Sequence, residues 1–422
     1  MCLTMLFAMS ACGSKGTGSG SATGGDAKKG VSEDILPRLD IKSEVSVPDD
    51  FKIGMICLHD ENSTYDNNFI QALKSAQKGL GLKDDQVIIV TGIGEDSKCY
   101  DTAVDLAKNK GCKVIFADSF GHESFMKQAA AEYPDVQFCH ATGTSGKIAG
   151  LANFHNAFAS IYEGRYLAGI AAGMKLNEMI DSGKIKAEEA VIGYVGAYTY
   201  AEVISGMTSF FLGARSVCET ATMKVRYTGS WYDQGKEQEA ATALIEKDKC
   251  VLISQHADSF GAPTACELAG VPNVSYNGST YSAGKNTFIV SSAINWAPYF
   301  QYIIECAVKG QAIDADWCGD IATNSVVLTG INQGVAAEGT EAKIKEAIDA
   351  FKAGTLKVFA TDKFTVDGKK LDEYLADVDG DFKGETNVIH DGYFDESNAK
   401  DFRSAPYFDI IIDGITNLNK EV

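Results

Sequence analysis

Short apolar runs alternate with amphipathic segments along much of this chain, and the alternation predicts the fold. Residues 223–228 alternate apolar and polar side chains as a pleated strand does, and residues 234–246 place their apolar side chains on one helical face. Residues 250–253 form an uninterrupted apolar run, which is typical of a strand covered on both faces. Strand, helix and strand in this order predict a βαβ unit with parallel strands.

The same pattern recurs on both sides of this unit. Further strands are expected at 51–58, 86–91, 113–117, 137–140, 191–195, 274–276 and 287–291, and further helices at 69–79, 99–110, 123–132, 161–179, 203–212, 295–309 and 341–353. A Val-Asp-Gly-Lys sequence at 366–369 predicts a hairpin turn. A series of βαβ units indicates an α/β fold with doubly wound parallel sheets, and we expect two such sheets with more than one crossing between them.

The loops that follow the strands carry the candidate chemistry. In open parallel sheets a ligand binds beyond the carboxyl ends of the strands. There the chain places Gly-Ser-Trp-Tyr-Asp at 229–233 and Gln-His-Ala-Asp-Ser at 255–259. A Trp and a Tyr beside hydrogen-bonding groups are typical of a binding face for a flat polar ligand. The alternative is that Trp231 simply packs over a helix end.

Composition and charge narrow the class of ligand. The chain has 422 residues, 45% of them hydrophobic and 23% charged, as in soluble globular proteins of two or three domains. Its formal net charge of −19 argues against nucleic acid and against docking on anionic lipid, because both need clustered Lys and Arg. Small neutral or cationic ligands remain open.

The N-terminus resembles a bacterial lipoprotein signal. A short apolar segment leads to Met-Ser-Ala-Cys-Gly at 9–13, and a Gly/Ser/Lys-rich stretch follows. The lipidated residue would be Cys12, with the following segment as a flexible tether. No apolar run reaches the ~18 residues that a membrane-spanning helix needs. The alternative is a disordered tail with a chance cysteine.

The chain has 11 cysteines, and the nine other than Cys2 and Cys12 are scattered, without a Cys-x-x-Cys pair, so a zinc ribbon is not indicated. Several lie in apolar runs, where cysteine behaves as a small buried hydrophobe. The acidic loop at 377–381 lacks the Gly and Glu of a calcium loop, and a solvated acidic loop is favoured. Residues 92–97 lack the third glycine of a dinucleotide fingerprint.

No phosphate loop, metal motif or activated nucleophile accompanies the strand-end aromatic and amide residues. A binding protein without cofactor or metal is therefore favoured over an enzyme. The alternatives are a sensor domain that presents its ligand to a signalling partner, and an enzyme acting on nucleosides or sugars. His59 and His256 follow strands, where each could hydrogen-bond a ligand or cap a turn.

With these loops laid out, the sequence resembles the basic membrane protein family of lipoprotein substrate-binding proteins, which serve ABC transporters for purine nucleosides and related bases. The resemblance is carried by the sequences at 114–143, 162–175, 193–217, 229–245, 255–259 and 291–300. It implies a type I periplasmic-binding-protein fold, with two doubly wound α/β lobes, a multi-strand hinge and a ligand in the cleft. It also implies an ABC permease and ATPase as partners, no nucleic acid, a monomer, and a lipid-anchored extracytoplasmic location.

The resemblance also assigns site residues. The family grips a purine with one aromatic from the first-strand loop, matched by Phe69 beside Asn68, and a second from the other lobe, matched by Trp231. The group after the third strand would be Asp118. The remaining expected ligand-binding residues follow other strands or neighbour these positions, and they are Ser119, Phe120, Tyr198, His256, Asp258, Asn277, Asn295 and Trp296.

Two of these positions depart from the nucleoside-binding members, which carry an acid and a Lys where this chain has Asn277 and Asn295. Neutral amides form weaker hydrogen bonds to ribose hydroxyls than charged groups do. We therefore expect a free base such as adenine to bind at least as tightly as its nucleoside.

The expected domains follow from the two sheets and the resemblance. They are a signal segment at 1–12, a flexible tether at 13–50, lobe 1 at 51–158 and 286–322, lobe 2 at 159–285 and 323–360, and a C-terminal extension packed on the lobes at 361–422.

Overall fold

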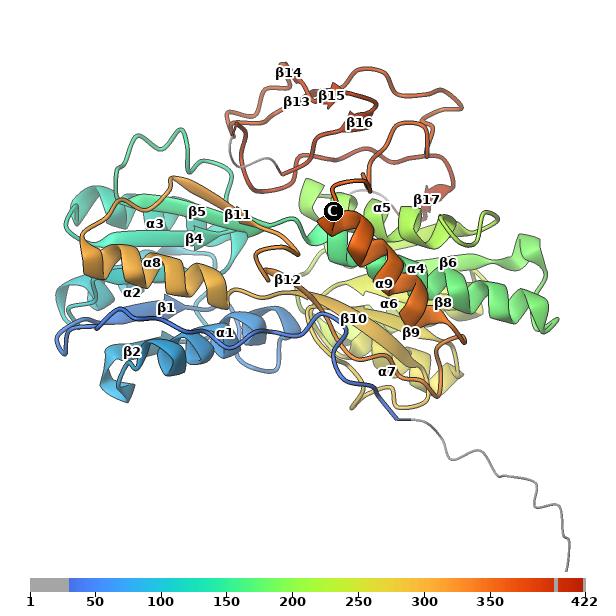
Figure 1. The fold of residues 1–422 in the computed structure, drawn as a ribbon, viewed down its shortest axis with the longest axis horizontal. Helices are drawn as coiled ribbons and strands as arrows, with labels where there is room; N and C mark the ends of the chain where they lie inside the picture. The colour runs from blue at the N-terminus through green and yellow to red at the C-terminus, as the bar shows by residue number, and fades with distance from the viewer. Residues whose placement is uncertain (1–29, 398–400, 420–422) are drawn as a thin grey trace, which may run out of the picture.

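The computed structural model describes residues 30–397 and 401–419, and these form two α/β lobes side by side (Figure 1). Cys12 and the signal segment lie outside the described residues. None of the described helices is both long and apolar enough to cross a membrane.

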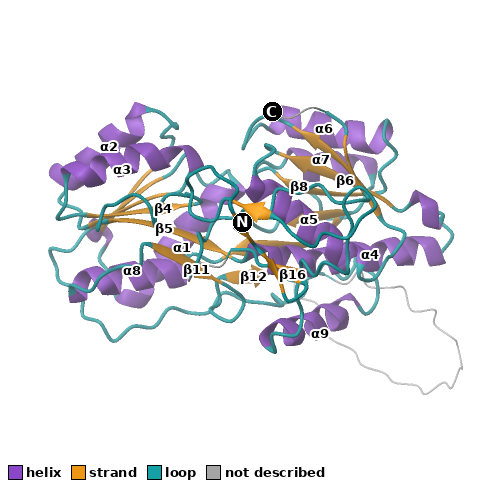
Figure 2. Cartoon of the chain, turned by 90° about the horizontal axis from the view of Figure 1, so that it is seen from above, coloured by secondary structure: helices purple, strands orange, loops and turns teal. Residues whose placement is uncertain are grey.

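The first lobe is built on a six-stranded, all-parallel sheet in the order β11-β5-β4-β3-β1-β2. The strands are β1 (Ile53–Ile56), β2 (Val87–Val90), β3 (Val114–Ala117), β4 (Gln137–Ala141), β5 (Phe154–Ala159) and β11 (Asp316–Gly319). One face is covered by α2 (Ser97–Lys108) and α3 (Glu123–Glu132), the other by α1 (Thr64–Leu80) and α8 (Ala297–Lys309) (Figure 2). Burial on both faces explains the apolar runs of the central strands.

The second lobe is built on a seven-stranded sheet in the order β12-β10-β9-β8-β6-β7-β17. The strands are β6 (Val191–Gly196), β7 (Thr222–Tyr227), β8 (Leu252–His256), β9 (Asn273–Tyr276), β10 (Phe288–Ile294), β12 (Val326–Leu328) and β17 (Ile415–Asn417), and only β12 runs antiparallel to its neighbour. The helices α4 (Ile161–Asp181) and α5 (Ala201–Arg215) cover one face, and α6 (Gln234–Glu246) and α7 (Gly261–Ala269) cover the other (Figure 2). A further helix, α9 (Thr340–Lys352), packs on α4.

Small residues let α4 and α5 approach closely. A Cβ at Gly169 would lie 2.0 Å from the Phe210 carbonyl oxygen, and a Cβ at Gly213 would lie 2.1 Å from that of Tyr166. Real Cβ atoms do not come this close to backbone, so larger residues would force the two helices apart.

Between β1 and β12 the chain crosses between the lobes three times, between β5 and α4, between β10 and α8, and between β11 and β12. Several crossings side by side form the multi-strand hinge of periplasmic-binding-protein folds. The two-lobed α/β architecture predicted from the sequence is thereby confirmed.

β5, β11, β12 and β17 were not predicted, and neither were the short strands between residues 375 and 394. In β5, polar His155 and Asn156 interrupt the apolar pattern, yet both are buried. The His155 ring contacts the Asp314 carbonyl and the Gln137 side chain, and Asn156 Oδ1 accepts from Gly143 N. These partners are distant in sequence, so local periodicity gives no sign of the strand.

The boundary expected at residue 286 is also wrong, because β10 is hydrogen-bonded to β9 and β12 in the second sheet. The chain returns to the first lobe only after β10, through α8.

The expectation of a flexible tether over 13–50 is wrong for residues 30–50, which lie along both lobes. Leu36 pairs with Leu328 beside the hinge, and Arg38 Nη2 donates to Asn68 Oδ1 on α1. Gln301 Nε2 on α8 donates to the Lys42 carbonyl at 2.9 Å. Backbone and side-chain hydrogen bonds fix this segment despite its polar composition.

The C-terminal segment lies across one side of both lobes (Figure 1). It contains two short antiparallel pairs, β13 (Leu375–Ala376) with β14 (Thr386–Asn387) and β15 (Ile389–His390) with β16 (Tyr393–Phe394). Ser404 N donates to Asp316 Oδ2 in the first lobe, and β17 extends the second sheet. Val366 and Lys369 exchange backbone hydrogen bonds in the predicted turn, as a single bridge rather than a longer hairpin.

The nine cysteines of the described chain are free thiols, and eight of them are buried. The prediction that most fill apolar core positions is confirmed.

Candidate functional site

A narrow cavity lies between the lobes, beyond the carboxyl ends of strands from both sheets. Its walls come from the loops and first helical turns that follow β1, β3, β4, β6, β7 and β8. The lining residues are Leu58, His59, Tyr65, Asp66, Ser119, Phe120, Thr142, Glu202, Trp231, His256 and Asp258.

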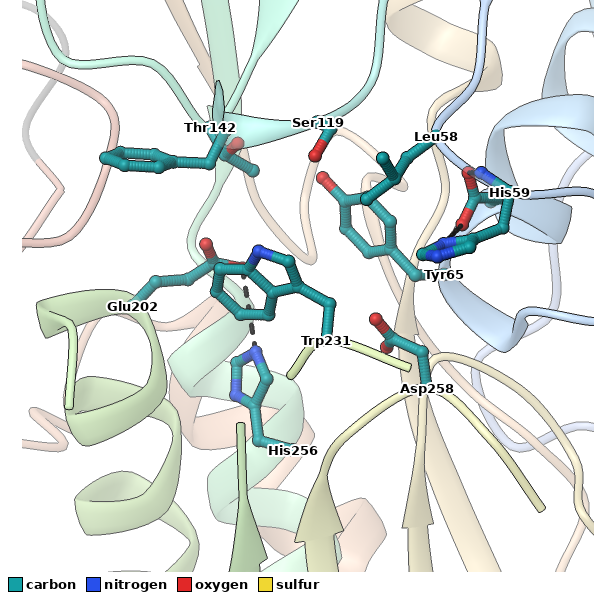
Figure 3. A pocket seen from close by; sticks show the side chains of 11 residues that line it. Leu58, His59, Tyr65, Ser119, Thr142, Glu202, Trp231, His256 and Asp258 are labelled. Carbon is teal, nitrogen blue, oxygen red and sulfur yellow. Dashed lines mark hydrogen bonds and ion pairs between the residues drawn. The ribbon is translucent and has the colours of Figure 1, made fainter. Parts of the chain in front are cut away.

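Two aromatic side chains face the cavity from opposite lobes. Tyr65 stands in the first turn of α1, and its hydroxyl donates to the Asp118 carbonyl at 2.7 Å. Trp231 projects into the middle of the cavity (Figure 3), and the Asp258 amide donates to its carbonyl at 3.0 Å. In the described part of the chain, Trp231 makes ring contacts with Tyr198 and Tyr200 but none with Tyr65. Tyr65 and Phe120 of the first lobe and Trp231 of the second thus give the cavity aromatic walls from both lobes.

The hydroxyl groups of the cavity give their protons to the protein itself. Tyr65 donates to a carbonyl, Ser119 Oγ donates to Glu95 Oε1 at 2.6 Å, and Thr142 Oγ1 donates to the Ala141 carbonyl at 2.6 Å. A hydroxyl that donates elsewhere still has lone pairs with which to accept. These three groups therefore present acceptors to a ligand.

Two carboxyl groups on the second lobe add to the acceptors. Glu202 Oε1 lies 3.6 Å from His256 Nε2, and Asp258 Oδ1 accepts from Asn277 Nδ2 at 3.0 Å (Figure 3). Burial lowers the pKa of His256 below its usual range, although Glu202 opposes this, so a neutral imidazole can donate Nε2–H to Glu202. Burial, with the nearby Asp66 and Glu237 charges, raises the pKa of Asp258 well above that of an ordinary Asp.

Asp118 is a further buried carboxyl, which lies behind the first-lobe wall of the cavity. Burial, followed by the charge of Asp66, raises the pKa of Asp118 well above its usual value. Cys57, Asp66 and Asp118 place one potential ligand atom each within 4.8 Å of one another. Both Asp66 oxygens already accept, from His59 N and from Ser63 Oγ, and burial raises the pKa of the Cys57 thiol. The cluster is therefore better suited to holding protons than to coordinating a metal ion.

Thr142 has a strained backbone at the cavity wall. Its φ of 66° lies in the left-handed region, which is unfavourable for a β-branched residue. Strain of this kind is concentrated at functional sites, where the surrounding structure holds it in place.

Five of the predicted site residues line the cavity, namely Ser119, Phe120, Trp231, His256 and Asp258. Three more lie directly behind it. Asp118 supports Tyr65 through its carbonyl, Tyr198 packs edge-on against Trp231 with ring centroids 4.9 Å apart, and Asn277 holds Asp258.

Phe69 and Trp296 do not line the cavity, which corrects the predicted aromatic of the first lobe. Their rings stack on one another in the core, with centroids 4.5 Å apart, and both side chains are buried. Phe69 lies on α1 one turn beyond Tyr65, on the face that packs against α8 and β3. Tyr65 therefore takes the place that was assigned to Phe69.

Asn68 and Asn295 are also turned away from the cavity. Asn68 accepts from Arg38, and Asn295 Nδ2 donates to the Asn324 carbonyl at 2.9 Å. Asn277 adopts a φ of 65°, a conformation that Asn tolerates better than most residues. Since Asn295 has a structural role in the hinge, its lack of charge carries no information about ribose.

Tyr65, Asp66, Leu58, Thr142 and Glu202 were missed among the lining residues, and His59 was noted as a possible hydrogen-bonding residue but not assigned to the site. A signal for the first two is present, because Ser63 caps α1 and its hydroxyl donates to Asp66 in the first turn. That cap starts the helix at Thr64 and puts Tyr65 at the strand end. Glu202 is the second residue of α5, as Tyr65 is of α1. The start of α5 was expected at 203, which left Glu202 outside the predicted helix.

Proteins with sequence similarity to this chain include two from prokaryotic sources. A putative ABC transporter glucose-binding protein of Haloferax volcanii is 36% identical over 207 residues, so the match spans about half of that relative, 49% of each chain. A purine-binding protein of Brucella abortus is 29% identical over 348 residues, which cover 78% of this chain and 93% of the relative.

A solved structure and a family model agree with this sequence similarity. A solute-binding protein of an ABC transporter system from Conexibacter woesei superposes with a TM-score of 0.56 at 21% identity, covering 73% of this chain and 98% of that one. The family model described as ABC transporter substrate-binding protein, PnrA-like, matches residues 56–353. The chain therefore belongs to the Bmp family of PnrA-like ABC transporter substrate-binding proteins.

Proposed function

We propose that this protein captures a purine base or nucleoside between its lobes and delivers it to an ABC import permease. The observation that carries the proposal is the pair of aromatic side chains, Tyr65 and Trp231, which face one small polar cavity from opposite lobes. Stacking between two rings is a general way to hold a flat heteroaromatic ligand. Drawing both rings together would close the lobes about the hinge. The purine-binding relative from Brucella abortus supports this choice of ligand.

Calorimetric titration of the ligand-stripped protein tests the proposal. Adenine and adenosine should bind with 1:1 stoichiometry, and mass spectrometry of the untreated protein should show a purine released on denaturation. The same titrations compare base with nucleoside. Absence of binding by either compound, with glucose bound instead, would reject the purine assignment.

A neutral sugar is the second candidate. It is supported by the acceptor-rich lining and by the glucose-binding relative from Haloferax volcanii. Sugar hydroxyls can donate to such acceptors, and a Trp ring can cover the apolar face of a sugar. A fluorescence titration distinguishes a purine from a sugar. Only an aromatic ligand quenches or shifts the fluorescence of Trp231 by ring stacking.

Trp231→Ala should weaken purine binding about ten- to a hundred-fold, which corresponds to the roughly 1–3 kcal/mol of base–aromatic stacking. The melting temperature of the free protein should change little, because Trp231 is only half-buried. Tyr281→Ala, which removes a partly exposed ring outside the cavity, is the matched control. A large drop in melting temperature with unchanged affinity would instead make Trp231 a packing residue.

We propose further that a lipid on Cys12 anchors the protein on the outer face of the cell membrane. The support is the small-residue sequence before Cys12 and the polar stretch after it. Two or more acyl chains are needed for stable anchoring. Cys12→Ser in the full chain should release the protein from membranes, and continued membrane association of this variant would contradict the anchor.

A further inference from the structure

The hydrogen-bonding groups of the cavity are unevenly divided between donors and acceptors. None of the described residues that line it is Lys or Arg, while three are carboxylic acids. The hydroxyls of Tyr65, Ser119 and Thr142 all donate to protein oxygens. Trp231, His59 and His256 carry N–H groups, but most polar side chains of the cavity offer oxygen lone pairs, so a ligand that supplies donors is favoured over one that presents acceptors or negative charge.

The three carboxyl groups differ in how far they are already satisfied. Asp66 receives hydrogen bonds on both oxygens, from His59 N and Ser63 Oγ. Asp258 receives one on Oδ1 from Asn277, and its carboxyl points toward Trp231 (Figure 3). Glu202 is contacted only through Oε1, by His256, in the described structure. Glu202 and Asp258 thus keep accepting capacity for a ligand.

Of Glu202 and Asp258, Glu202 has the side chain whose position is more tightly fixed. It stands in the first turn of α5, and its side chain is 14% exposed. His256 is itself buried against Tyr276, with ring centroids 4.6 Å apart, and so holds the carboxyl toward the cavity beside Trp231 (Figure 3). An edge of a ring stacked on Trp231 would meet this carboxyl.

We propose that Glu202 selects purines with an amino group at that edge over purines with a carbonyl group there. The inference rests on the proposed purine-binding function and specifies its ligand class. An exocyclic amine donates to the carboxylate of Glu202, whereas a carbonyl oxygen at the same place meets it acceptor to acceptor. Phosphorylated nucleotides are excluded for the same reason.

Titration of the wild-type, ligand-stripped protein is the first test. Adenine, unsubstituted purine and hypoxanthine should bind with affinities that fall in this order, with about tenfold or more between adenine and hypoxanthine. Hypoxanthine bound as tightly as adenine would overturn the inference while leaving the purine function intact. Failure of all three to bind would reject the proposed function itself.

Glu202→Gln is the second test. Its amide N–H can donate to a carbonyl, so the affinity ratio of adenine to hypoxanthine should narrow by about tenfold. Glu239→Gln, which removes an exposed carboxyl of the same lobe that does not line the cavity, should leave the ratio within about twofold. If Glu202→Gln does not fold by circular dichroism, Glu202→Asp keeps the carboxylate and should keep the preference for the amine. An unchanged ratio in folded Glu202→Gln, or loss of the preference in folded Glu202→Asp, would overturn the role of Glu202.

Discussion

Phe69→Ala should lower the free energy of unfolding by about 3–5 kcal/mol, the usual cost of emptying a buried aromatic site. The ring is fully buried on α1, where it stacks on Trp296 and tilts against Phe116 with centroids 5.4 Å apart. Many other contacts fix the helix and the sheet, so the void left by the Phe69 ring would collapse only in part. Chemical unfolding followed by circular dichroism measures the loss.

Two further variants serve as comparisons for Phe69→Ala. Phe382→Ala removes a ring that is 86% exposed, so its stability should stay within about 0.5 kcal/mol of the wild type. Tyr65→Ala, one turn before Phe69 on the same helix, should weaken purine binding and affect stability less. A Phe69→Ala protein of normal stability with lost affinity would restore Phe69 as the ligand-binding aromatic.

Local periodicity was sufficient where an element buries apolar side chains in a regular pattern. Helix α6 spans Gln234–Glu246 and α3 spans Glu123–Glu132, as the sequence predicts. The missed strands β5, β11 and β12 lie next to the hinge crossings. There the chain satisfies buried polar groups through distant partners, such as Asp316 with Ser404, which no short window of sequence contains.

The site was predictable to the extent that parallel sheets gather their strand-end loops at one edge. That rule found Trp231, His256 and Asp258, which all line the cavity. It could not separate Tyr65 from Phe69, since both follow β1 and lie one helical turn apart. The decision depends on where α1 begins, and the Ser63 cap fixes that start.

The structure was also needed to place the residues outside the family match. The segments 30–50, 361–397 and 401–419 are polar and irregular in sequence, yet they make hydrogen bonds with the lobes. Phe408 illustrates this, because it is fully buried and stacks on Phe359 with centroids 4.4 Å apart. The buried aromatic side chains of the C-terminal segment thus join the main core of the chain and hold the segment on the lobes.

A buried carboxyl in that core should make its stability depend on pH. Glu396 is 4% exposed, its Oε2 accepts from Phe408 N at 3.0 Å, and its Oε1 has no hydrogen-bond partner among the described residues. Burial raises the pKa of Glu396 to about 7, against the action of Ser205 and the backbone amides. The folded protein therefore binds this proton more tightly than the unfolded chain does. Its contribution to stability is fully present below the unfolded pKa and is lost as the pH rises through 7.

Glu396→Gln should remove this dependence. An amide carries no charge to bury and can still accept from Phe408 N. Relative to the wild type, the variant should gain roughly 3 kcal/mol of unfolding free energy between pH 4.5 and pH 8.5, from the shift of about two and a half pKa units. Chemical unfolding at both pH values measures the gain, with exposed Glu373→Gln as the control. An equal stability difference at both pH values would mean that Glu396 is ionised in the folded protein throughout this range.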